Sequence, residues 1–140
     1  MFTLQLVLWL SLAFQPKPGL APQADPQAQL VVLKVGDEAE IDRGRLHLKF
    51  EEVLSDSRCP RGNRCIWAGE ARVQVWAKEA AEPGRTLVIA GPARSFYDVS
   101  KNYSLQIRAL EPYPEAGVEK PTEYRLTMAI RAATNDSPAK

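Results

Sequence analysis

Residues 45–54 have the sequence RLHLKFEEVL, in which apolar and polar side chains alternate. Leu46, Leu48 and Phe50 point to one side of an extended chain, and His47 and Lys49 point to the other. This two-residue period is typical of a β-strand with one buried face. We therefore expect a strand here that turns its apolar side toward a core.

Further along the chain, residues 71–77 (ARVQVWA) show the same alternation. Shorter apolar runs separated by Gly, Pro and Asp turn signals occupy residues 29–35, 38–41, 86–90, 103–109 and 124–131. No stretch shows a helical period, and no internal repeat appears. About seven or eight short strands at this spacing predict an all-β, single-domain antiparallel β-sandwich of Greek-key or immunoglobulin-like type.

The two ends of the chain differ from this pattern. Residues 6–14 form an apolar run that is too short to span a bilayer, which takes roughly 20 residues, and that has the length of a signal-peptide core. A proline-rich stretch follows it. We predict a signal peptide and leader over 1–24, a β-sandwich domain over 25–133 and a flexible tail over 134–140; a buried N-terminal element and an uncleaved membrane tether are the alternatives.

The net charge is close to zero. The chain has 18 basic and 17 acidic residues, and removal of residues 1–24 takes away Lys17 and no acid, which leaves 17 of each. Such a balance offers no bulk field for nucleic acid or for an anionic membrane. We expect no nucleic-acid partner, and membrane contact only through the signal segment during export.

The most informative stretch is residues 56–71, DSRCPRGNRCIWAGEA. Five residues separate Cys59 from Cys65, and Pro60 and Gly62 between them favour a chain reversal. Such a reversal brings the two Cα atoms within disulfide range. In an oxidising compartment we expect the pair to form a disulfide, which by chain entropy contributes roughly 2 kcal/mol.

Three arginines accompany the cysteines. A closed loop would hold Arg58, Arg61 and Arg64 on one projecting turn, where their guanidinium groups offer forked donors to carboxylates or phosphates. Asp56 and Glu70 are the nearest acids that could neutralise them. Two interpretations stay open: a solvated, stapled loop, and a recognition loop.

Trp67 follows Cys65 by two residues, which puts both on one face if the segment is a strand. A tryptophan packed on a disulfide is a core feature of immunoglobulin sandwiches. We expect Trp67 to pack beneath the disulfide, with ligand stacking as the alternative.

Metal and catalytic interpretations have less support. Cys59, Cys65, His47 and Asp56 are the available metal ligands, but their spacing is not that of a zinc knuckle, and a disulfide removes both thiolates. A Ser-His-Asp arrangement would need His47, the only histidine, beside a serine and an acid such as Asp98. We predict no catalytic residue, no metal and no cofactor.

The segment DSRCPRGNRCIWAGEA, preceded by LHLKFEEVL, resembles a group of small exported bacterial proteins with no established activity. These share the DSRCP…CxWxG motif, a long strand after it, and two later strands that begin with Tyr, the first ending in a Pro-Tyr-Pro-like stretch. The resemblance covers about residues 30–130. It implies export, the disulfide and a β-sandwich, and it implies no activity.

Together these features predict an exported, non-enzymatic binding or interaction module, located in the periplasm or outside the cell. The speculative binding residues are Arg58, Arg61, Arg64, Asp56 and Trp67, for a protein or an anionic ligand. The alternatives are a protease-inhibitor-like loop that presents Arg61 or Arg64, and a metal-binding periplasmic protein.

Overall fold

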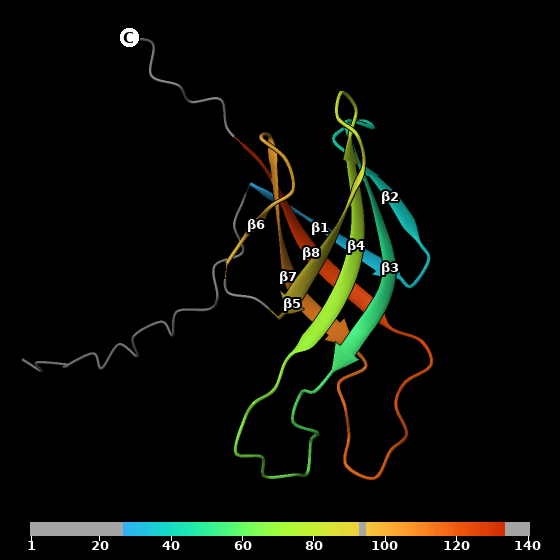
Figure 1. Cartoon of the computed structure of the whole chain (residues 1–140), viewed down its shortest axis with the longest axis vertical. Coiled ribbons are helices and arrows are strands. Elements are labelled where there is room, and N and C mark those ends of the chain that lie inside the picture. Colours follow the sequence, from blue (N-terminus) through green and yellow to red (C-terminus); the bar gives the residue numbers. More distant parts are fainter. Residues whose placement is uncertain (1–26, 93–94, 134–140) are drawn as a thin grey trace, which may run out of the picture.

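The computed structural model describes residues 27–92 and 95–133, which form eight strands and no helix (Figure 1). Within this part of the chain there is consequently no helix long and apolar enough to cross a membrane. The predictions for residues 1–24 and 134–140 lie outside the described residues.

The strands make two four-stranded antiparallel sheets, which confirms the predicted β-sandwich. The first sheet has the order β2-β3-β4-β5 and comprises Glu38–Ile41, Leu46–Asp56, Ala71–Glu79 and Arg85–Gly91. The second has the order β1-β8-β7-β6 and comprises Ala28–Lys34, Arg125–Ala132, Tyr103–Glu111 and Tyr97–Asp98. An immunoglobulin constant domain instead orders its strands 1-2-5-4 and 3-6-7, so the strand order here is different.

The alternation in β3 fixes its orientation. Leu46, Leu48 and Phe50 are fully buried, whereas His47 and Lys49 on the other face remain half-buried beside the acids of β2. β4 supplies Val73 and Val75 to the same core, and the second sheet closes it mainly with Leu105, Ile107, Leu126 and Met128. The core is therefore made by the inward faces of two amphipathic sheets, as the two-residue period predicts.

Seven of the eight strands lie where the apolar runs place them, with ends shifted by one or two residues. β7 ends at Glu111, directly before Pro112, as expected from a residue that cannot donate to a ladder. β6 was not predicted, because two residues, Tyr97 and Asp98, are too few to show a period.

The longest connections gather at one end of the sandwich. Residues 57–70 join β3 to β4 and residues 112–124 join β7 to β8, and both project from the lower end in Figure 1. We call them the Cys loop and the Tyr loop, since the second begins and ends close to Tyr113 and Tyr124. A parallel bridge between Arg61 and Glu115 links the two, so they lie side by side.

Candidate functional site

The base of the Cys loop continues the pairing of β3 with β4. After the last strand pair, Asp56 with Ala71, the Ser57 amide donates to the Glu70 carbonyl at 2.9 Å and the Cys59 amide donates to the Ala68 carbonyl at 2.8 Å. The Ser57 hydroxyl adds two more bonds to Glu70 on the opposite side of the stem, accepting from the Glu70 amide and donating to the Glu70 carbonyl. The base is thus an ordered two-chain stem rather than a free loop.

Gly69 is required in this stem. Its φ is +69°, and a Cβ built on it would lie 1.8 Å from the Ser57 carbonyl oxygen and 3.0 Å from Arg58 Cα. Such an approach to backbone leaves room only for glycine. The glycine of the CxWxG motif therefore lets the two sides of the stem approach each other.

Arg58 turns inward from the stem and is only 5% exposed. Its Nε and Nη2 atoms donate to the two carboxylate oxygens of Asp56 at 2.8 and 2.7 Å. Nη1 donates to the Leu110 carbonyl at 2.7 Å and Nη2 to the Pro112 carbonyl at 3.2 Å. The prediction that Arg58 projects with the other two arginines is wrong: its fork joins the Cys loop to the end of β7.

Asp56 is equally enclosed, with 4% of its side chain exposed. Burial by itself would raise the pKa of its carboxyl group. The side-chain and backbone hydrogen bonds from Arg58, the charge of Arg58 and the Tyr124 hydroxyl, which donates at 3.4 Å, outweigh burial and lower that pKa. Burial, together with the charge of Asp56 and this hydrogen bond, raises the pKa of Tyr124. The Asp56–Arg58 pair is therefore a satisfied structural unit.

Arg61 lies against the Tyr loop. Its amide donates to the Pro114 carbonyl at 2.9 Å, and its carbonyl accepts from the Ala116 amide at 3.0 Å. Its Cζ atom lies 5.0 Å from the centroid of the Tyr113 ring, which Arg58 also contacts, at 4.7 Å. An inhibitor loop needs an extended, unpaired backbone at the residue that it presents to the protease. Because the backbone of Arg61 is paired with the Tyr loop, Arg64 is the remaining candidate for the inhibitor hypothesis.

The two loops also have opposite net charges. The Cys loop has three arginines and one glutamate, a net charge of +2, whereas the Tyr loop has one lysine and three glutamates, a net charge of −2. This complementarity favours their contact. From the sequence, the arginines of the Cys loop were expected to face an outside ligand. Much of their positive charge instead faces another part of the same chain.

The disulfide predicted from the sequence is present. Cys59 and Cys65 are bonded, their Cα atoms are 5.9 Å apart, and the described residues include no free cysteine. A turn with Gly62 at φ +90° lies inside the ring and is closed by the Asn63 amide on the Pro60 carbonyl at 3.1 Å. A disulfide indicates a non-cytoplasmic environment.

The outer part of the Cys loop faces solvent. Ile66 is 94% exposed and Trp67 82% exposed, and Arg64 is exposed beside them. The prediction that Trp67 packs beneath the disulfide is wrong, because this segment is not a strand and the same-face rule for residues two apart does not hold. We call Arg64, Ile66 and Trp67 the tip.

The remaining sequence candidates are not brought together. His47 on β3 has its Nδ1 atom 3.7 Å from Glu40, and Asp98 belongs to β6 of the other sheet. Both cysteine sulfurs are in the disulfide, and Asp56 is engaged with Arg58. Among the described residues, no three His, Cys, Asp or Glu side chains form a group suited to a metal ion.

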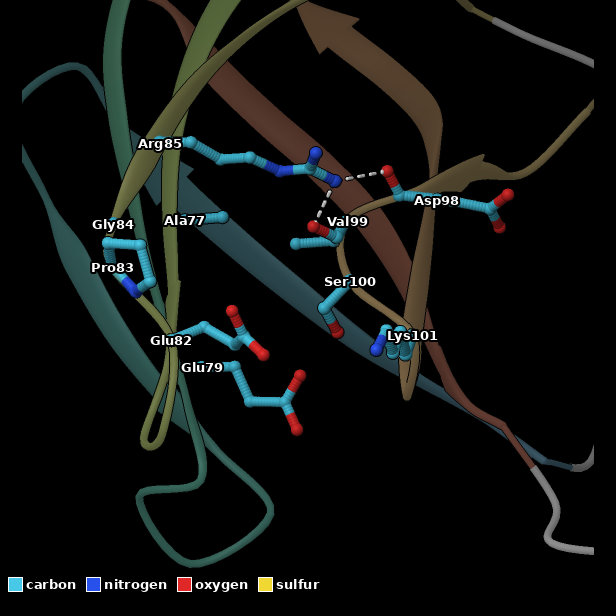
Figure 2. A pocket seen from close by; sticks show the side chains of 10 residues that line it. All are labelled: Ala77, Glu79, Glu82, Pro83, Gly84, Arg85, Asp98, Val99, Ser100 and Lys101. Carbon is cyan, nitrogen blue, oxygen red and sulfur yellow. Dashed lines mark hydrogen bonds between the residues drawn. The ribbon is translucent and has the colours of Figure 1, made fainter.

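A cavity of about 620 Å³ lies at the opposite end of the sandwich (Figure 2). There Arg85 donates to the backbone carbonyls of Asp98 and Val99, and the Glu79 carboxylate accepts from Asn102 at 2.6 Å. The pKa of Glu79 is lowered by hydrogen bonds from Ser100 and Asn102. Because Arg85 is held by these backbone carbonyls, it joins β5 to the β6–β7 turn, and Lys101 is the second cation in the lining of this cavity.

Sequence reasoning did not identify the Tyr loop. Tyr113, between two prolines, and Tyr124, at the start of the last strand, are in the motif layout, but they looked like generic β pattern. The signal that was present is the acidic charge of 112–124 opposite the basic Cys loop. This charge pattern predicts a contact only when it is already known that the two loops are neighbours.

No family model, no curated protein and no solved structure matches the chain.

Proposed function

We propose that the protein is an exported, non-enzymatic binding module that contacts a protein partner through the tip of its Cys loop. The observation that carries this proposal is the 82% exposure of Trp67 on a loop whose base is fixed. Tryptophan and arginine are the residue types most enriched at the centres of protein interfaces. A solvated loop has no need for an isoleucine and a tryptophan that are adjacent and both exposed.

The tip is held in place before any partner arrives. The stem hydrogen bonds, the disulfide and the Arg61–Glu115 bridge restrict the backbone on both sides of it. Binding by a preorganised loop avoids much of the ordering cost that a flexible loop incurs. The construction of the loop therefore favours a contact role.

A protein partner suits the tip better than a small anion does. Arg58 is engaged with Asp56, and Arg61 lies on Tyr113, so Arg64 is the arginine of this loop that faces solvent without a partner among the described residues. One solvated guanidinium makes a weak phosphate or carboxylate site. The apolar pair beside it adds contact area that a protein surface can cover.

Export is the second part of the proposal. It is supported by the disulfide, which persists in oxidising compartments, and by the apolar run at residues 6–14 with its signal-peptide length. We place the protein in the periplasm or outside the cell, in line with the resemblance to exported bacterial proteins.

The test is site-specific photo-crosslinking in the native host, with a photoreactive amino acid in place of Ile66. We expect one discrete crosslinked protein, and a loss of at least tenfold when Trp67→Ala is added. Val88→Ala, at a 50% exposed position on β5, is the matched control and should leave the product unchanged. No discrete product, or a product insensitive to Trp67→Ala, would contradict the proposal.

A further inference from the structure

A second cavity lies between the base of the Cys loop and the Tyr loop. Its volume is about 480 Å³, within the range of roughly 300–1,000 Å³ common for ligand sites. The tip does not line it, so it is a separate feature of the same end of the molecule. We call it the loop pocket.

The loop pocket is lined mostly by apolar side chains that contain rings. Two tyrosines and four prolines contribute, and their positions are Tyr113, Tyr124, Pro60, Pro112, Pro114 and Pro121. Val118, 65% exposed, forms part of its wall. Flat aromatic and proline surfaces of this kind accommodate proline-rich peptides, whose extended helix has three residues per turn and a low ordering cost.

The polar groups of the pocket are divided between its interior and its exposed part. Asp56 and Arg58 neutralise each other and are hydrogen-bonded, so they require no charge from a ligand. The exposed charged residues are Glu115, Glu119 and Lys120. Two basic against three acidic lining residues give the pocket a net charge of −1, and this excess is carried by the exposed glutamates.

We infer that the loop pocket binds a basic, proline-containing extended segment of a protein partner. The prolines of that segment lie against the tyrosine and proline rings, and its lysine or arginine side chain pairs with Glu115 or Glu119. This inference rests on the proposed function only in taking the partner to be a protein. It adds a second contact and the chemistry of the segment recognised.

The test is a ¹H–¹⁵N NMR titration of the full exported protein with acetylated, amidated pentapeptides. Pro-Pro-Arg-Pro-Pro is the probe, and Pro-Pro-Glu-Pro-Pro and Gly-Gly-Arg-Gly-Gly are the matched peptides. We expect saturable shifts at the amides of Tyr113, Val118 and Tyr124 with the probe. Both matched peptides should bind at least fivefold more weakly.

Two variants test whether the negative charge of the loop pocket causes the preference for the basic peptide. Glu115→Gln combined with Glu119→Gln should reduce the preference for the basic over the acidic peptide to less than twofold. Glu82→Gln, in the cavity at the other end, should leave the preference unchanged. Absence of saturation, equal binding of the basic and acidic peptides, or shifts confined to residues away from the pocket would overturn the inference.

The outcome is independent of the crosslinking test. A crosslink that depends on Trp67, together with no peptide binding, would refute peptide binding at the loop pocket and support the role proposed for the tip. Peptide binding at the loop pocket, together with no crosslink from residue 66, would refute the role proposed for the tip and support the inference about the pocket.

Discussion

The two halves of the Cys loop use similar residues for opposite purposes. In the inner half, residues 57–59 and 68–70, Arg58 is 5% exposed and bonded to an acid and two carbonyls. In the outer half, residues 60–67, Arg64 and Trp67 are exposed. Arginines six positions apart thus serve the fold in one case and face outward in the other.

The difference follows from which groups each half can reach. The inner half lies over the end of β7, where the Leu110 and Pro112 carbonyls need donors. The outer half extends beyond both sheets, and the Tyr loop lies beside it (Figure 1). The inner half should therefore control stability, and the outer half should be largely dispensable for folding.

The largest expected effect comes from Arg58→Ala. Removing one member of a buried ion pair leaves Asp56 uncompensated and two carbonyls without their donor, at a cost of about 3–5 kcal/mol in the free energy of unfolding. Urea denaturation measures this. Arg64→Ala, the matched control in the outer half, should change the stability by less than about 0.5 kcal/mol, and equal costs for the two variants would remove the distinction between the halves.

Gly69→Ala should have the next largest effect. The new Cβ collides with the Ser57 carbonyl in addition to the strain of a positive φ, so we expect a loss of about 2–3 kcal/mol. Gly117→Ala is the control, because Gly117 has a φ of +77° but no atom within 4 Å of the added Cβ. It should cost only about 1 kcal/mol, and a Gly69→Ala variant no worse than this would show that the close approach is unimportant.

Replacing both cysteines by serine should cost roughly 2 kcal/mol by chain entropy. The stem hydrogen bonds and the Arg58 contacts do not depend on the disulfide. Hydrogen exchange should therefore increase within residues 60–66 and stay slow at the Ser57 and Cys59 amides. Loss of protection at those two amides would mean that the disulfide, and not Arg58, holds the stem.

Acid should weaken the inner half in part. The pKa of Asp56 is lower in the folded protein than the ordinary value of about 3.9. The ionised carboxylate therefore contributes stability above that value, which is lost as the pH falls from it toward the folded pKa. Thermal unfolding between pH 6 and pH 3 should show a smaller acid-induced decrease for Asp56→Asn than for the wild type, and identical decreases would contradict this role of Asp56.

Much of the fold was predictable because the alternation that defines each long strand is local. In β3 and in β4, the alternation within about ten residues is enough to predict which face of the strand is buried. The role of Arg58 was not predictable in this way, since its acceptors at Leu110 and Pro112 lie more than fifty positions along the chain. The Tyr loop was missed for the same reason.

Trp67 shows the opposite error. Its spacing from Cys65 suggested a shared strand face, but residues 66 and 67 lie in a bend outside every strand. The resemblance to a disulfide-packed tryptophan of an immunoglobulin core depended on that strand. The motif identified the important loop but did not reveal which of its residues are buried.

The most direct test of the central claim is the free energy of unfolding of Trp67→Ala, measured by urea denaturation beside the wild type. A tryptophan that serves only a partner should be removable at a change of less than about 0.5 kcal/mol. A core tryptophan costs about 3–5 kcal/mol when truncated to alanine. We predict the first result for Trp67→Ala, and a loss in the second range would contradict an outward-facing role for Trp67.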